Sequence, residues 1–256
     1  MSDERGTTPS LALLGSGEFE PWTEEVDRWL LGRATGDGSI LILPTASAAE
    51  GDEVFERWGR MGLDHYRALS VRAELVPLKT PADAQRDDLF ARLETASMAY
   101  FSGGNPAYLA SVLRGSRFWE ELLSAIRRGM AYTGCSAGIA CLGDLAVDSG
   151  AHMRGQRDIW KPGVRMFPGV QLAPHWDGLN RYVPGLQAMF IAAVPPGRTL
   201  VAIDERTAMV GDGADWQVIG VGAASIRRNG EWRTFRAGQS FTEPFDIELD
   251  PAPAGA

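Results

Sequence analysis

Residue types that build disulfides and metal centres are scarce in this sequence. The 256 residues include two cysteines, Cys135 and Cys141, and three histidines. Two thiols at this spacing do not suggest a disulfide framework, and two ligands alone make a poor zinc site. We therefore expect reduced thiols and no metal centre.

The sequence also lacks long apolar runs and an excess of basic residues. No apolar run reaches about 18 residues, the length typical of a membrane-spanning helix. There are 25 Lys and Arg against 33 Asp and Glu, a net charge of -8 at pH 7, which argues against a nucleic-acid partner. Residues 1–10 are polar and contain no apolar signal-peptide segment. We expect a cytoplasmic protein with neither a membrane nor a nucleic-acid partner. The oligomeric state stays open, with a homodimer as one option.

The first two-thirds of the chain contains several short apolar runs. Runs of this length that are apolar on both faces are typical of buried parallel strands, and they fall at residues 11–14, 40–43, 73–78, 98–101 and 131–133. Helical spacing appears between them at 84–93 and 118–128. This alternation predicts an α/β fold with a doubly wound, mostly parallel sheet flanked by helices.

After about residue 196 the pattern changes to closely spaced strands. Candidates are 199–203, 207–210, 216–221, 223–227 and 232–235, and Asn229-Gly230 is a hairpin signal. We expect an antiparallel C-terminal extension of one α/β domain over residues 10–248. Residues 1–9 are expected to form a disordered leader and residues 249–256 a disordered tail.

The sequence Gly134-Cys-Ser-Ala-Gly138 follows one predicted strand and precedes an apolar helix start. A Gly-x-Ser-x-Gly turn in that context is typical of a nucleophile elbow, in which Ser136 would attack a carbonyl carbon. The alternative is a tight turn that small residues allow for packing alone. A thiol amidotransferase is a rival function because Cys135 lies in the same turn, but Ser136 holds the central position.

A second glycine loop, Ser102-Gly-Gly-Asn-Pro106, follows the predicted strand 98–101. Backbone N–H groups of Gly103 and Gly104, together with that of Ala137, are candidate donors to an oxyanion. The alternative is a plain strand-to-helix turn with Pro106 at the first helical position. At the carboxyl edge of a parallel sheet, both loops would lie where sites form.

Three histidines are candidates for the general base. His65 is expected on a helix surface and His152 in a polar loop, whereas His175 follows a predicted strand within Pro174-His-Trp-Asp177. His175 is therefore our choice, against the alternative of a structural histidine beside Trp176.

The base needs a carboxylate to orient it. The apolar strand 199–203 ends in Asp204 and Glu205, whose side chains should point in opposite directions. Asp177 is a third candidate. The residues themselves leave the choice open.

Together these segments resemble the S51 serine peptidase family, which includes dipeptidase E and cyanophycinase. The resemblance covers residues 11–241 and rests on Gly15-Ser-Gly-Glu18, Leu43-Pro-Thr-Ala46, Phe101-Ser-Gly-Gly-Asn105, Gly134-Cys-Ser-Ala-Gly138, Pro174-His-Trp176 and Ile203-Asp-Glu-Arg-Thr-Ala208. It implies a fold similar to class I glutamine amidotransferases. It also implies Ser136 as nucleophile, His175 as base and Glu205 as acid, with no cofactor.

The same resemblance implies a small peptide as substrate, with basic side chains that bind a substrate carboxylate. Pro174-His is closer to dipeptidase E than to cyanophycinase, and the arginine-rich run of cyanophycinase is reduced here to Arg181. Candidate substrate-binding residues are Asn105, Arg154, Arg157 and Arg181, although arginines are usually solvated surface residues. We expect a serine exopeptidase with a preference for Asp-containing peptides. The alternatives are a cyanophycinase-like β-aspartyl peptide hydrolase and a catalytically silent amidotransferase-like binding protein.

Overall fold

A mixed eight-stranded sheet runs through the middle of the computed structural model, which describes residues 8–151, 154–156 and 158–250. Its strand order is β14-β11-β10-β1-β5-β4-β2-β3, and the five strands from β1 to β3 in this order are parallel. The strands are β1 (Ser10–Leu14), β2 (Ile40–Leu43), β3 (Ala73–Leu75), β4 (Met98–Phe101), β5 (Ala131–Cys135), β10 (Thr207–Gly211), β11 (Asp215–Gly220) and β14 (Ser240–Thr242). The predicted α/β class with a mostly parallel sheet is confirmed.

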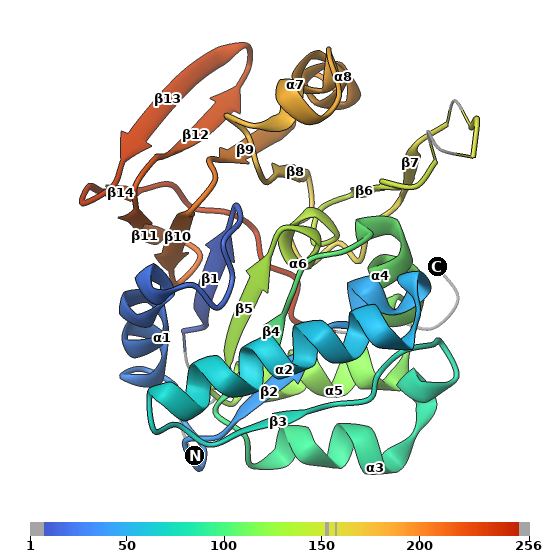
Figure 1. Cartoon of the computed structure of the whole chain (residues 1–256). Coiled ribbons are helices and arrows are strands. Elements are labelled where there is room, and N and C mark those ends of the chain that lie inside the picture. Colours follow the sequence, from blue (N-terminus) through green and yellow to red (C-terminus); the bar gives the residue numbers. More distant parts are fainter. Residues whose placement is uncertain (1–7, 152–153, 157, 251–256) are drawn as a thin grey trace.

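A second, four-stranded sheet lies beyond the carboxyl ends of β1 and β5 (Figure 1). It has the order β13-β12-β9-β8, with β8 (Val170–Ala173), β9 (Thr199–Ile203), β12 (Ala223–Arg228) and β13 (Glu231–Arg236). A short ribbon of β6 (Leu145–Val147) and β7 (Trp160–Pro162) stands beside it. The C-terminal strands are therefore divided: β10, β11 and β14 extend the main sheet, whereas β9, β12 and β13 belong to the second. The hairpin at Asn229-Gly230 joins β12 to β13, and both residues have positive φ as this turn requires.

Helices cover both faces of the main sheet (Figure 1). They are α1 (Glu24–Leu31), α2 (Asp52–Ala68), α3 (Asp87–Phe90), α4 (Pro106–Leu113), α5 (Arg117–Arg127) and α6 (Ala137–Ala140), and α7 (Leu179–Tyr182) and α8 (Leu186–Ala193) accompany the second sheet. The 3-10 helices are η1 (Pro21–Thr23), η2 (Thr45–Glu50), η3 (Asp83–Gln85) and η4 (Ala91–Glu94). The continuous helix predicted for 84–93 is wrong, because η3, α3 and η4 divide that segment.

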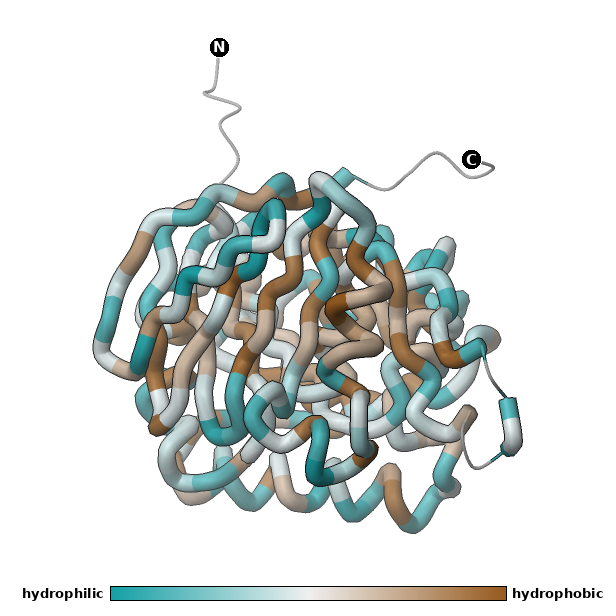
Figure 2. Tube along the Cα trace, turned by 90° about the horizontal axis from the view of Figure 1, so that it is seen from above, coloured by the Kyte–Doolittle hydropathy of each residue, from teal (hydrophilic) through white to brown (hydrophobic). Residues whose placement is uncertain are grey.

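The two faces of the sheet have separate cores, as alternation along a strand requires. Leu11 and Leu13 of β1 join the core that includes residues of α4 and α5, whereas Ala12 and Leu14 join the core that includes residues of α1 and α2. Figure 2 shows the apolar strands in the interior and hydrophilic turns around them. The central strands of the main sheet, which are buried throughout, are thus a rigid base for the loops at its carboxyl edge.

The chain remains in contact with the rest of the fold up to residue 250. Leu249 packs against the main core and Asp250 pairs with Arg127, so the chain still contacts the domain at these two residues of the expected tail. Within the described residues, no helix is long and apolar enough to cross a membrane.

The end of β1 packs directly on the end of β9, and this contact joins the two sheets. Within the main sheet, Gly15 donates its N–H to the carbonyl of Thr207, the first residue of β10, at 2.9 Å. A Cβ at Gly15 would lie 2.0 Å from the carbonyl oxygen of Asp204, so only glycine fits here. The loops that follow β1 and β9 are therefore held side by side.

We expect Gly15→Ala to lower the free energy of unfolding by about 1–3 kcal/mol, because the backbone must move to admit the methyl group. Urea denaturation measures the change. Gly32→Ala is the matched control, since Gly32 has φ -70 and its Cβ would meet nothing closer than 3.2 Å. Equal stability of the Gly15 variant and the wild type would contradict the close contact.

Candidate active site

Ser136 occupies a strained turn between β5 and α6, with φ 52 and ψ -107. The glycines two residues away on each side make this turn sterically possible. A Cβ at Gly134 would lie 2.4 Å from the carbonyl oxygen of Gly138, and a Cβ at Gly138 would lie 2.4 Å from that of Phe101. The Ser136 N–H donates to the Leu14 carbonyl at 3.0 Å, which ties the turn to the end of β1. Strain held in this way is characteristic of functional sites.

His175 follows β8 and also has a positive φ, 54. Its Nε2 lies 2.8 Å from the Oγ of Ser136. The turn is fixed by the N–H of Trp176, which donates to the Ile203 carbonyl, and by the N–H of Gly178, which donates to the His175 carbonyl. The second sheet thus places an imidazole within hydrogen-bond reach of a serine that the first sheet carries.

Glu205 lies on the other side of the imidazole. Its Oε1 is 3.3 Å from Nδ1 of His175 and accepts a hydrogen bond of 2.5 Å from the Tyr182 hydroxyl, while its Oε2 pairs with Arg181 at 3.1 Å. The Tyr182 bond is the largest cause that lowers the pKa of Glu205, and His175 and Arg181 lower it further against the opposing effect of burial. The carboxylate is therefore ionised at neutral pH.

The other two carboxylates that the sequence offered serve the backbone. Asp204 accepts the Ala223 N–H at 2.9 Å, and burial raises its pKa. Asp177 accepts the N–H of Glu205 at 2.8 Å and so helps to fix Glu205 in place. Of the three acids, Glu205 is the one hydrogen-bonded to His175.

The Gly103-Gly104 loop lies against Ser136: a Cβ at Gly103 would be 3.7 Å from the serine Oγ. The Gly103 N–H, however, donates to Oε1 of Glu18 at 2.8 Å. This bond corrects the expectation that Gly103 offers its N–H to an oxyanion. Among the described residues the N–H of Gly104 has no acceptor, and Ala137 begins α6 and so has none within that helix. Gly104 and Ala137 remain as candidate donors to an oxyanion.

The proposed substrate-binding side chains have partners within the protein. Asn105 caps α4 by accepting from the N–H groups of Ala107 and Tyr108, and its amide donates to Asp148 at 2.8 Å. Arg154 pairs with the other oxygen of Asp148 at 2.5 Å. Asn105 therefore ties the loop after β4 to the loop after β6, and Arg154 forms an ion pair within the latter loop. Both have structural roles.

Arg181 is placed differently, because it pairs with Glu205 beside His175 while its side chain is 66% exposed. Among the described members of the expected set, it is the one that the structure brings to the cluster of Ser136, His175 and Glu205. Arg157 and His152 lie outside the described residues.

His65 is far less exposed than expected. It lies on α2, but its side chain is only 7% exposed and its Nε2 is 2.7 Å from Asp27, which Tyr66 also contacts. Its ring also packs near Phe19. These contacts give His65 a structural role between α1 and α2.

Neither thiol is poised for nucleophilic chemistry. Cys135 is buried and donates its S–H to Glu18 Oε2 at 3.0 Å, and burial raises its pKa well above the ordinary range. Burial raises the pKa of Cys141 to about 12. The thiol form of both residues therefore dominates at neutral pH, which disfavours a cysteine nucleophile. Among the described residues, no three acidic, histidine or cysteine side chains gather as metal ligands.

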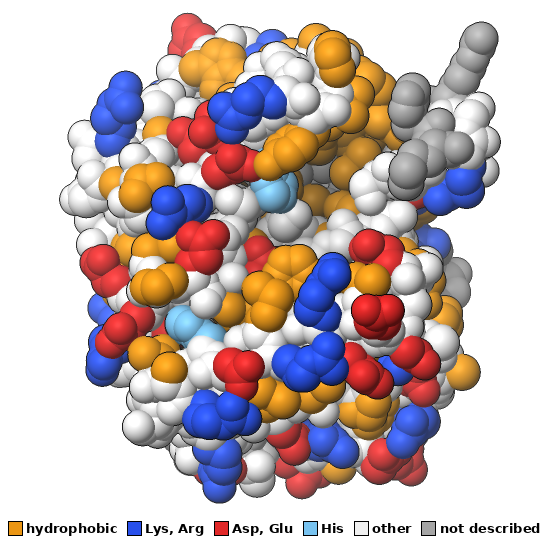
Figure 3. All heavy atoms as spheres, viewed as in Figure 1, with side chains coloured by type: hydrophobic (Ala, Val, Ile, Leu, Met, Phe, Trp, Pro, Cys, Tyr) orange, Lys and Arg blue, Asp and Glu red, His pale blue; other side chains and the backbone are white. Residues whose placement is uncertain are grey.

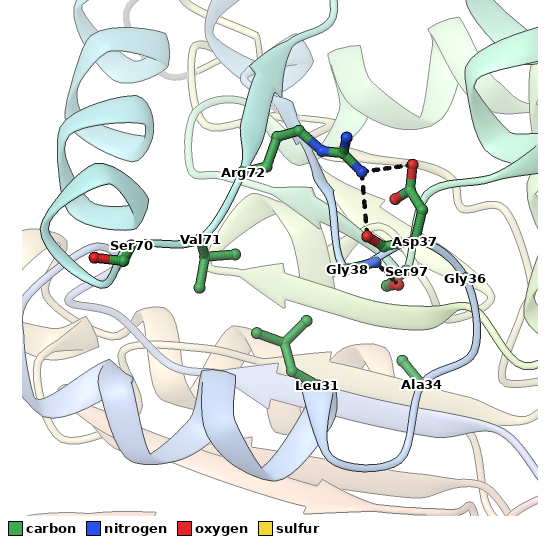
Figure 4. A pocket seen from close by; sticks show the side chains of 9 residues that line it. All are labelled: Leu31, Ala34, Gly36, Asp37, Gly38, Ser70, Val71, Arg72 and Ser97. Carbon is green, nitrogen blue, oxygen red and sulfur yellow. Dashed lines mark hydrogen bonds and ion pairs between the residues drawn. The ribbon is translucent and has the colours of Figure 1, made fainter.

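Figure 3 shows the face of Figure 1 hollowed beside a histidine, with charged side chains grouped on one side and hydrophobic ones on the other. An open pocket of about 600 Å³ lies elsewhere, at the amino ends of β2, β3 and β4 (Figure 4). There Arg72 pairs with Asp37, and Ser97 accepts from the Gly38 N–H. Its polar groups thus satisfy one another, and no nucleophile–base pair lies among its lining residues.

Sequence reasoning gave no role to Glu18 or Tyr182. Glu18 directly follows the segment Gly15-Ser-Gly17 at the carboxyl end of the first strand. A charged residue at that position was a signal that its side chain could lie near the other loops at the same edge of the sheet. Tyr182 gave none, because an exposed tyrosine on a short helix resembles any surface residue.

Comparisons with known proteins agree with this fold. The sequence profile of Peptidase family S51 matches residues 11–219, and the chain therefore belongs to this family of serine-type peptidases. A cyanophycinase from Trichormus variabilis is 26% identical over 235 residues, 88% of this chain and 76% of that protein. One from Synechococcus elongatus is 30% identical over 202 residues, 76% of this chain and 60% of that protein. The structure of a peptidase from an acI-B1 Actinobacterium has a TM-score of 0.83 at 27% identity, over 92% of this chain and 97% of that one.

We expect Tyr182→Phe to lower the free energy of unfolding at pH 7 by about 1 kcal/mol, because a hydrogen bond to an ionised but partly exposed carboxylate is lost. The pKa of Glu205 is lowered in the folded state, so this stabilisation is present above the ordinary glutamate pKa of about 4.3 and disappears as the pH falls through the lowered value. Urea denaturation of the wild type and the variant at pH 7 and at pH 3 measures the loss of stability and its dependence on pH.

Tyr108→Phe is the control, since its hydroxyl donates to the uncharged carbonyl of Lys79 and its loss should not depend on pH in this range. An effect of Tyr182→Phe that is the same at both pH values would contradict the role of the ionised Glu205.

Proposed function

We propose that this protein is a serine exopeptidase that hydrolyses small peptides through an acyl-enzyme. Ser136 is the nucleophile, His175 the general base and Glu205 the acid that orients the base. The observation that carries the proposal is the hydrogen bond of 2.8 Å between Nε2 of His175 and Oγ of Ser136, with Nδ1 directed to Glu205. A turn of this shape between a parallel strand and a helix is a nucleophile elbow.

The mechanism follows from these positions. Oγ of Ser136 attacks the peptide carbonyl carbon while His175 takes its proton, and the N–H groups of Gly104 and Ala137 stabilise the oxyanion. The intermediate collapses as His175 protonates the leaving amine. Water then attacks the acyl-enzyme with His175 again as base, which releases the acid and restores Ser136. Ionised Glu205 favours the imidazolium form in both steps.

A preference for Asp-containing peptides is the finer part of the proposal. Arg181 supports it, because an exposed guanidinium beside the triad has donors left to bind a substrate carboxylate. A cyanophycinase-like β-aspartyl peptide hydrolase is the second candidate, and the similarity of this chain to cyanophycinases favours it. A silent binding protein has less support, since His175 is within hydrogen-bonding distance of both Ser136 and Glu205.

A dipeptide screen separates these candidates. It includes Asp-X and X-Asp peptides, isoaspartyl peptides and the β-Asp-Arg dipeptide. Selective release of an N-terminal Asp supports the exopeptidase, whereas turnover restricted to β-linked peptides supports the second candidate. Absence of both turnover and fluorophosphonate labelling supports the binding protein.

We expect Ser136→Ala to reduce hydrolysis by about 10³-fold or more and to abolish labelling by a fluorophosphonate, because the nucleophilic oxygen is lost. Cys135→Ser is the matched control: it keeps a donor to Glu18 and should retain most of the activity. Mass spectrometry of the labelled protein and kinetics on the best dipeptide measure both. An active Ser136 variant beside an inactive Cys135 variant would refute the serine mechanism.

We expect Glu205→Gln to lower kcat by about 10²–10⁴-fold, since loss of a triad carboxylate disfavours the required tautomer and the imidazolium. Asp204→Asn is the control, because Asp204 faces β12 rather than His175 and should change stability more than kcat. Steady-state kinetics and thermal melting separate the two effects. Near-normal turnover of the Glu205 variant together with a large loss in the Asp204 variant would assign the acid role to Asp204.

A further inference from the structure

Glu18 is a buried carboxyl beside the nucleophile to which the mechanism above assigns no step. The residue is 7% exposed, and its two oxygens accept from the N–H of Gly103 and the S–H of Cys135. Among the described residues no Lys, Arg or His pairs with it. Burial of a carboxyl without a cation costs stability, so its retention in this place needs a reason.

The chain fixes Glu18 in this position through its neighbour Phe19. Phe19 has a positive φ of 63, and its ring packs 4.6 Å from Tyr100 and 6.3 Å from Tyr66, centroid to centroid. A left-handed phenylalanine is a strained residue that only such packing tolerates. Next to this anchored residue, the Glu18 side chain points inward and contacts the loop after β4 and the end of β5.

The Gly103-Gly104 loop is thereby held from two sides. Glu18 takes the Gly103 N–H on one side. On the other, Gly104, with φ 142, lies so close to η2 that a Cβ would be 2.4 Å from the Ala46 carbonyl, and that carbonyl accepts the Asn105 N–H at 2.8 Å. The N–H groups before and after Gly104 are thus both occupied, and its own is left without an acceptor among the described residues.

We propose that Glu18 is a positioning residue for the oxyanion loop: by accepting the Gly103 N–H it fixes the Ser102–Gly103 peptide plane, and so orients the next peptide, which presents the Gly104 N–H beside Ser136. This inference rests on the proposed serine mechanism and assigns Glu18 no contact with substrate. The hydrogen bond and the reach of the side chain carry the role, rather than its charge. A misplaced oxyanion donor costs about 10²-fold in rate.

The test measures the second-order rate of inactivation by a fluorophosphonate, which needs no knowledge of the natural substrate, together with kcat and KM on the best dipeptide. Glu18→Gln keeps the length and a carbonyl acceptor, and should stay within about threefold of the wild type. Glu18→Met has a similar length and no acceptor, and should lose about 10²-fold in both inactivation rate and kcat with little change in KM. Thermal melting checks that each variant folds.

Glu18→Asp keeps the charge but is too short to reach Gly103, and should be impaired like Glu18→Met. It replaces Glu18→Met as the variant without an acceptor for Gly103 if the Met variant does not fold. An active Asp variant beside an inactive Gln variant, or a Met variant within threefold of the wild type, would overturn the inference. The proposed function has its own outcome in the same assay: if wild type is not labelled at Ser136, that function fails. If wild type is labelled and Ser136→Ala is not, the Glu18 variants alone decide.

Discussion

The left-handed backbone of Ser136 is the constraint around which this site is organised. It exists because α6 lies so close to β5 and to the end of β4 that neither Gly134 nor Gly138 has room for a side chain. Close backbone contact on both sides, and the bond from Ser136 to Leu14, hold a conformation that an isolated serine would leave. The parallel sheet, buried on both faces, supplies the rigidity that this requires.

The second sheet brings the remaining groups to that serine. β8 and β9 are parallel neighbours, so the residues that follow them, His175 and Glu205, emerge at the same edge. The contact of Gly15 with the Asp204 backbone then fixes the distance between the two sheets. The distance of 2.8 Å between His175 and Ser136 thus depends on backbone packing that involves neither side chain.

Local sequence predicted the parallel strands and the turn at Ser136, because both are encoded by a few adjacent residues. It did not predict that Thr199–Ile203 would pair with β8 in a separate sheet, since pairing is decided by residues about thirty positions apart. The alternation of side chains along a strand predicted that Asp204 and Glu205 point in opposite directions, but not which of them faces His175. The expected donor Gly103 could not be excluded either, because its N–H is taken by Glu18, which is 85 positions away.

The Glu205 carboxylate contacts His175, Arg181 and the Tyr182 hydroxyl. These three groups lower its pKa to different extents, and the differences indicate what the carboxylate does. Arg181 would neutralise it and weaken its attraction for an imidazolium, but Arg181 is largely exposed and a screened pair of this kind contributes little. Tyr182 is the larger influence on the Glu205 pKa, and a hydroxyl donor fixes an oxygen without cancelling its charge. Because Asp177 also holds the backbone N–H of Glu205, the carboxylate is restrained in position and remains charged. Those are the two properties that an acid needs in order to select one imidazole tautomer and stabilise its protonated form.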